Sequence, residues 1–195
     1  MDWQIQLPVS QADASLSLDW TRNFLAQYDC SHIESLRIER SRRRKGGVCG
    51  KCFFPTKLNP KYRLLCQVPG PFPCEILIRK SPLYRNTDGS WPRIPPGCAR
   101  GTHFIDQRTG REWIRLYGKT ALRDLNEGIV WIVAHEAFHY LRRTRQVPGR
   151  NTEIDADRFA DEMLLDYQRK HGPTSITPLT LGSAALRGLR RAIGM

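Results

Sequence analysis

The sequence has no long hydrophobic run. Its longest apolar stretch, Ile129 to Ala134, is far shorter than the roughly 20 residues that a transmembrane helix needs. The first ten residues, MDWQIQLPVS, lack the basic start and the apolar stretch of a secretory signal. We therefore expect a cytoplasmic protein that does not cross a membrane. There is also no internal repeat, which argues against repeat architectures.

Acidic residues are scarce in the middle of the chain. Residues 35–119 contain nineteen Lys and Arg but only five Asp and Glu, whereas residues 1–34 have a net charge of −4, and the whole chain has +12. A basic surface of this kind favours contact with polyanions. Nucleic acid is therefore an expected partner of region 35–119, the alternative being a solvated surface that aids solubility.

The patterning predicts an α+β protein of 195 residues, in which a small mixed sheet packs on two helices. Helices are expected over 12–28, over 120–143 with Thr120 as N-cap, and over 152–170 with Asn151 or Thr152 as N-cap. Strands are expected around 36–38, 62–68 and 75–79, and a hairpin is expected over 102–106 and 112–117 with Gly110 in its turn. The expected organisation is an N-terminal helix and strand (1–45), a Cys-rich basic loop insert (46–74), a catalytic core (75–170) and a C-terminal tail (171–195).

The strongest motif is His135-Glu136-Ala137-Phe138-His139, which matches H-E-x-x-H. Residues four apart lie on one face of a helix, so His135 and His139 can bind the same metal ion. Glu136 lies one step round the helix, where it can act as a general base towards a water on that metal. The alternative is a helix whose His and Glu simply face water, but the apolar run before His135 favours a buried helix.

The third ligand is expected on the following helix. Glu153 and Asp157 are four residues apart and share a helix face, so Glu153 could bind the metal while Asp157 accepts the Nδ1 proton of His135. Asp155 and Asp157 are alternative ligands. Small residues on or beside this face would let the two helices approach closely: Ala156 and Ala160.

Together, H-E-x-x-H and the later Glu153-Ile-Asp-Ala-Asp-Arg-Phe-Ala160 segment resemble the gluzincin branch of the zincin metallopeptidases. The segment is most similar to small zincins of the ImmA/IrrE type, over about residues 112–165. The resemblance implies a zincin fold and a zinc-dependent hydrolase that cleaves a protein or peptide. It also implies that strand 112–117 is the edge strand that holds the substrate. SprT-like proteases are a second resemblance, but their cysteines typically follow the catalytic helices.

A second, structural zinc is a hypothesis for the cysteine-rich segment. Cys49 and Cys52 have the C-x-x-C spacing of a zinc knuckle, and Cys66 and Cys74 would complete a four-cysteine site. The alternative is a set of scattered buried thiols. Basic and aromatic residues alternate in the same region and are of the type that binds single-stranded nucleic acid: Arg42 to Lys45, Lys51, Phe53, Phe54, Lys57, Lys61, Tyr62 and Arg63.

Two functions are therefore considered. The first is a zinc metallopeptidase with Glu136 as the catalytic base. The alternative is a zincin-fold module that binds nucleic acid or protein with weak or no catalysis. The intact Glu136 favours the enzyme. The sequence identifies no oxyanion stabiliser, because packing or solvent roles are expected for the nearby polar candidates Tyr140, Tyr167 and His171.

Overall fold

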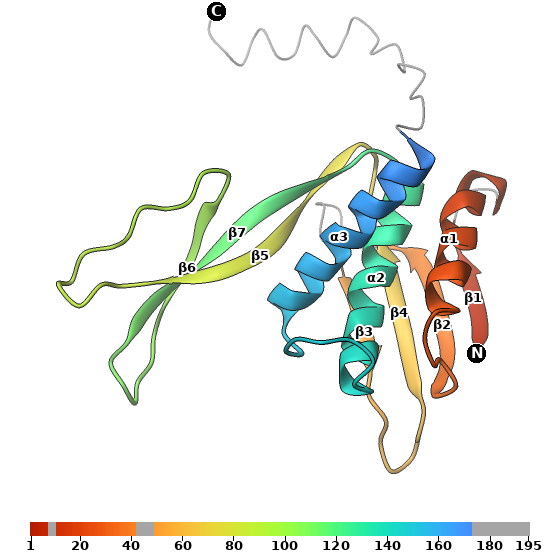
Figure 1. Ribbon diagram of the computed structural model, residues 1–195, viewed down its shortest axis with the longest axis horizontal. Helices are drawn as coiled ribbons and strands as arrows, with labels where there is room; N and C mark the ends of the chain where they lie inside the picture. The colour runs from red at the N-terminus through yellow and green to blue at the C-terminus, as the bar shows by residue number, and fades with distance from the viewer. Residues whose placement is uncertain (8–10, 42–48, 173–195) are drawn as a thin grey trace, which may run out of the picture.

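The computed structural model describes residues 1–7, 11–41 and 49–172, and it confirms the α+β class. The described part has three α-helices and two small sheets (Figure 1). The helices are α1 (Ser15–Leu25), α2 (Leu125–Arg143) and α3 (Glu153–His171), and a 3₁₀ helix, η1 (Gln11–Ala14), precedes α1. None of these helices has the length and apolarity needed to cross a bilayer.

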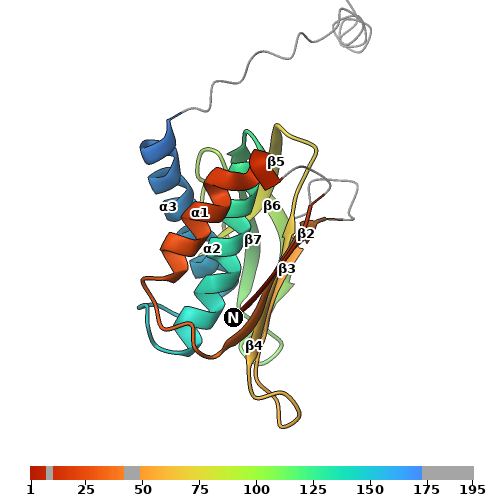
Figure 2. The same cartoon turned by 90° about the vertical axis from the view of Figure 1, so that its right-hand side faces the viewer.

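The first sheet has four strands in the order β1 (Asp2–Gln6), β2 (Ile33–Arg40), β4 (Tyr62–Val68) and β3 (Cys49–Phe53). Strands β1, β2 and β4 run parallel, and β3 is antiparallel to β4. Alternate side chains of β2 and β4, such as Ile38 and Leu64, are buried because the helices cover one face of this sheet (Figure 2). Helix α2 packs against β3, β4, α1 and α3, and this central place explains its continuous apolar run.

The prediction that residues 46–74 form a loop insert is wrong for the described part of that segment, residues 49–74. Strand β4 was expected over 62–68, but it pairs in parallel with β2 in the core sheet. Strand β3, which was not expected, pairs with β4 from Cys49 opposite Gln67 to Phe53 opposite Arg63. The segment is therefore part of the same core as the N-terminal helix and strand, because its inward-facing side chains pack under α2.

The second sheet forms an arm that projects away from the helices (Figure 1). Its strand order is β5 (Cys74–Tyr84), β7 (Glu112–Leu122) and β6 (Ala99–Ile105), all antiparallel. At the base of the arm, Ile76, Ile78 and Leu122 join the main core. The expected hairpin is present, and Gly110 has the positive φ of +66° that its turn requires.

Helix α2 begins later in the chain than the sequence predicted. Asp124 caps α2 by accepting a hydrogen bond from the backbone N–H of Glu127, whereas the expected cap, Thr120, lies within β7. Strand β7 continues further than the pattern indicated because it pairs with β5 as far as Leu122. Thr152 caps α3 as expected. The expected C-terminal tail beyond 172, like Arg42 to Lys45, lies outside the described residues.

Candidate metal site

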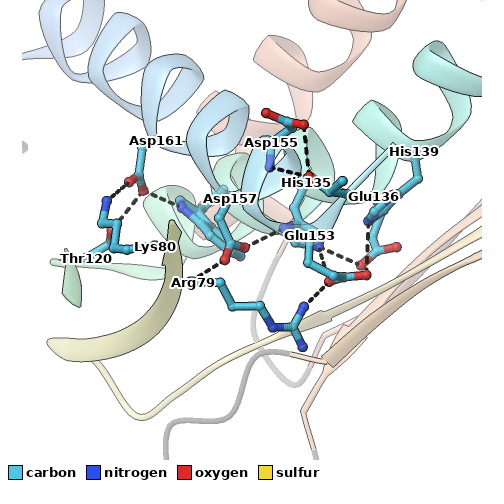
Figure 3. A network of polar contacts seen from close by, with 12 residues as sticks. Arg79, Lys80, Thr120, His135, Glu136, His139, Glu153, Asp155, Asp157 and Asp161 are labelled. Carbon is cyan, nitrogen blue, oxygen red and sulfur yellow. Dashed lines mark hydrogen bonds and ion pairs between the residues drawn. The ribbon is translucent and has the colours of Figure 1, made fainter. Parts of the chain in front are cut away.

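The structure brings His135, His139 and Glu153 together into a group that could hold a metal ion. Both histidines are on α2, and Glu153 is the first residue of α3. Glu153 lies between the two rings, with Oε2 3.5 Å from His135 Nε2 and Oε1 3.6 Å from His139 Nε2. Figure 3 shows the two imidazoles and the carboxylate converging. The turn between α2 and α3 therefore reverses the chain, so that Glu153, the predicted third ligand, lies next to His135 and His139 of α2.

The Nδ1 atom of each histidine faces an oxygen, which leaves Nε2 free to bind a metal. His135 Nδ1 is buried and lies 3.0 Å from Asp157 Oδ1, an ion-pair contact rather than a well-aligned hydrogen bond. This is the contact that the sequence suggested for Asp157. His139 Nδ1 lies 2.8 Å from Asn151 Oδ1. The sequence offered Asn151 only as a helix cap, because nothing in its spacing links it to His139.

Arg79 on β5 was not expected at the site. Its guanidinium contacts Glu153 Oε2 at 2.5 Å, and its backbone N–H donates to Asp157 Oδ2 at 2.6 Å (Figure 3). Arg79 therefore connects the base of the arm to Glu153 and Asp157 of α3. In the sequence it is only the last residue of an expected strand, so no local signal marks it.

Asp161, one turn beyond Asp157, links α3 to neighbouring elements by hydrogen bonds. Its Oδ1 accepts hydrogen bonds from Thr120 Oγ1 at 2.8 Å and Trp131 Nε1 at 2.9 Å. These contacts tie α3 to β7 and α2 (Figure 3). They hold the helix in the position from which Glu153 reaches the histidines.

Glu136 is buried beside the group, with 3% of its surface exposed. Burial raises the pKa of its carboxyl to about 7, and the charge of His135 and a hydrogen bond from the backbone of Cys52 partly oppose that rise. The carboxylate lies against Gly50 of β3, where a Cβ would overlap it. A carboxyl held near neutral pKa next to a metal-ligand group has the property expected of a general base.

The acids of the site stabilise positive charge at His135 in the metal-free protein. Burial lowers the pKa of His135, but its contacts with Asp157 and Glu153 outweigh this and raise the pKa to about 9. The contact with His135 holds the pKa of Glu153 at about 2, so Glu153 is ionised. Burial lowers the pKa of His139, so that ring tends to be neutral, which is the form that binds a metal.

The group opens into a cleft of about 450 Å³ between β3 and the base of the arm. Gly50 and Phe54 lie on one side, and Arg79 and Tyr117 line the other. The polar candidates from the sequence do not line it: Tyr140 donates to the carbonyl of Asp29, Tyr167 is buried, and His171 ends α3. The polar side chains that line the cleft beside the metal-ligand group include Lys51, Arg79 and Tyr117.

Comparison with protein-family models, curated proteins and solved structures finds no significant match.

The structure does not bring the cysteines together as a second metal site. Among the described residues, Cys52, Cys66 and Cys74 do not form a group of three ligands, and the side chain of Cys49 lies outside the described part. Burial raises the pKa of Cys52 to about 12, and Cys66 is fully buried in the core. Among the described cysteines, Cys52, Cys66 and Cys74 therefore do not support the four-cysteine zinc site, and the alternative of scattered buried thiols fits these three.

The expected substrate strand is also wrong. Strand β7, which contains residues 112–117, lies in the middle of its sheet, because β5 and β6 pair with its two edges. An extended peptide cannot add to a strand whose two edges are occupied. Within the described residues, two strands that line the cleft also end their sheets, β3 and β5, but the backbone N–H of Arg79 on β5 already donates to Asp157.

Proposed function

We propose that this protein is a zinc-dependent metallopeptidase with a zincin-like core. The observation that carries the proposal is the arrangement of Glu136 beside His135, His139 and Glu153. Two imidazoles and one carboxylate form a three-residue ligand set that leaves a position open, which is typical of catalytic zinc. A structural site would be closed by a fourth protein ligand, and none joins this group among the described residues.

The spacing of the ligand atoms suits zinc. Zinc lies about 2.0–2.1 Å from nitrogen and oxygen ligands, so two ligands of a tetrahedral site are about 3.4 Å apart. Glu153 Oε2 lies 3.5 Å from His135 Nε2 and Glu153 Oε1 lies 3.6 Å from His139 Nε2, and one ligand atom from each of the three residues lies within 4.8 Å of the others. Asp157 and Asn151 hold the rings in the orientation that binding requires. The type of the ligand atoms and their closeness are therefore both compatible with zinc.

Different residues of the site would carry different parts of peptide hydrolysis. A zinc ion, when bound, supplies a Lewis acid at the floor of the cleft. Glu136 takes the proton of the attacking water and passes it to the leaving amine. Arg79 and Tyr117 line the cleft, where they could stabilise negative charge on the carbonyl oxygen of the substrate.

The substrate fits as an extended peptide along β3. This strand ends its sheet, and Gly50, Lys51 and Cys52 line the cleft beside Glu136. Exposed strand edges bind peptides through backbone hydrogen bonds. The proposal thus assigns to β3 the role that the sequence suggested for 112–117.

The test is the metal content of the purified full-length protein, measured by elemental analysis after dialysis against zinc. We expect one equivalent in the wild type, loss of that equivalent in His139→Ala, and no change in His32→Ala, whose side chain is exposed outside the site. Glu136→Gln should keep the zinc and lose hydrolysis of a peptide library, read by mass spectrometry. If His139→Ala retains the metal, the proposal is wrong.

The alternative of a binding module without catalysis makes a different prediction. Zinc would bind as above, but wild type and Glu136→Gln would leave the peptide library equally intact. The burial of Glu136 and its near-neutral pKa favour the enzyme, because a buried carboxyl without a role is costly to retain.

A further inference from the structure

One face of the arm combines aromatic rings with arginines. In the antiparallel register, Trp113 lies opposite Tyr84 on β5 and Phe104 on β6, and directly opposed residues share a face. Arg115 and Tyr117 follow Trp113 at two-residue intervals and so lie on the same side. We call this surface the arm face: Tyr84, Phe104, Arg111, Trp113, Arg115 and Tyr117.

The arginines of the arm face lie over its rings. Arg111 lies 4.0 Å from the ring centre of Tyr84, and Arg115 lies 4.8 Å from Phe104 and 5.9 Å from Trp113. The Phe104 and Trp113 rings stack with centroids 4.2 Å apart and planes 15° apart. The result is a layered surface of flat rings and guanidinium groups.

No acid among the described residues forms an ion pair with the arginines of the arm face. Neither Arg111 nor Arg115 takes part in an ion pair among the described residues. The acid nearest in sequence, Glu112, is on the opposite side of β7 and is bound by Arg85 and His103. The two arginines therefore remain available to an anionic ligand.

The rings of the arm face lie outside the main core. The buried side chains of the outer part of β7 are Ile114 and Leu116, with 1% and 2% of their surface exposed, and they lie on the other side of the sheet. On the arm face Tyr84 is 40% exposed, and Phe104 and Trp113 are half-buried. Partly exposed aromatic residues outside the core are typical of binding surfaces.

The arm face continues into the cleft of the metal site. Tyr117 belongs to both surfaces, and Trp113 and Arg115 line a second hollow with Arg79 and Glu153. A ligand that lies along the arm would therefore reach the side of the proposed active site. Figure 1 shows the arm running outward from beside α3.

We propose that the arm face binds single-stranded nucleic acid. Bases of any sequence stack on flat aromatic rings, and the arginines meet the phosphates. An acidic peptide would use the arginines but would have no need of the stacked rings. A duplex hides its bases and could use only the charges. The combination of rings and unpaired arginines thus favours a single strand, and this inference does not depend on catalysis.

The test is fluorescence anisotropy of a labelled oligo-dT of about 20 nucleotides with the full-length protein. Arg111→Gln/Arg115→Gln should weaken binding by about tenfold or more and lower the salt dependence. Phe104→Leu keeps an apolar side chain but removes the ring, and should weaken binding by about fivefold or more. Circular dichroism should show that both variants fold.

The matched control is Arg22→Gln/Lys170→Gln, which removes two charges from exposed positions on α1 and α3. It should change affinity less than about twofold. Equal losses in the control and the arm variants would contradict the proposal, as would unchanged binding by Phe104→Leu. Equal competition by polyglutamate or by a duplex would also overturn it, because charge alone would then explain binding. Retention of binding in His139→Ala is expected, whether or not the metallopeptidase proposal is right.

Discussion

The carboxylate of Glu136 occupies the space that a side chain at Gly50 would need. Position 50 lies on β3 and Glu136 lies on α2, so the glycine lets an edge strand approach the buried acid. The same strand contributes a backbone hydrogen bond to that acid through Cys52. The position of the proposed base therefore depends on a strand that the motif does not include.

Substitution of Gly50 by alanine should separate metal binding from catalysis. The added Cβ must displace Glu136 or β3, at a cost of about 1–3 kcal/mol in the free energy of unfolding. We expect one equivalent of metal to remain, because the three ligands lie elsewhere, while peptide hydrolysis falls at least about tenfold. Elemental analysis, thermal unfolding and the peptide-library digest measure the three effects. Unchanged hydrolysis would show that β3 does not position Glu136.

The side-chain oxygens that face the Nδ1 atoms of the two histidines should control metal affinity. Asn151→Ala removes the partner of His139 Nδ1, and Asp157→Asn removes the charge beside His135. Each change should weaken zinc binding by about 10–100-fold, as measured by competition with a chelating dye. Asp166→Asn, which changes an acid in an exposed pair with Lys170, is the matched control. Wild-type affinity in both variants would mean that the rings need no such support.

Glu136 should make the metal-free protein less stable as the pH rises. Its pKa is raised from 4.5 to about 7 in the folded state, so the folded protein binds an additional proton between these values. The stabilising contribution is complete below about pH 4.5 and is lost as the pH rises through about 7. In a chelator, the stability of wild type relative to Glu136→Gln should therefore fall between pH 5 and 8, by roughly 3 kcal/mol at most. Denaturant unfolding at several pH values measures the difference, and a flat difference would contradict the burial of an ionisable group.

The buried cysteines should resist alkylation. Cys52 has a pKa of about 12 and Cys66 one raised well above its usual value, in both cases mainly through burial, and the reactive form of cysteine is the thiolate. Iodoacetamide at pH 8 should leave both unmodified in the native protein and modify both after unfolding, as read by peptide mass spectrometry. A chelator that exposed both thiols and released a second zinc equivalent would instead restore the four-cysteine site.

Several parts of the site follow from the local sequence. The four-residue spacing places His135 and His139 on one face of α2, and the same spacing places Glu153 and Asp157 on one face of α3. The apolar run before His135 indicates a buried helix, and it lies at the centre of the core. These features could be predicted because helical periodicity is a property of neighbouring residues.

Tertiary structure alone decided the rest. The approach of Gly50 to Glu136 and the contacts of Arg79 with α3 join segments far apart in the sequence, and sheet pairing sets them. Cys52 is a candidate ligand through its C-x-x-C spacing and Cys66 only as a completing ligand, but strand alternation and burial put both thiols in the core. Periodicity describes which face a residue takes, but not which distant strand or helix that face will meet. The sequence therefore determined the metal-ligand pattern, and the packing of β3 and the arm against α2 and α3 determined its surroundings.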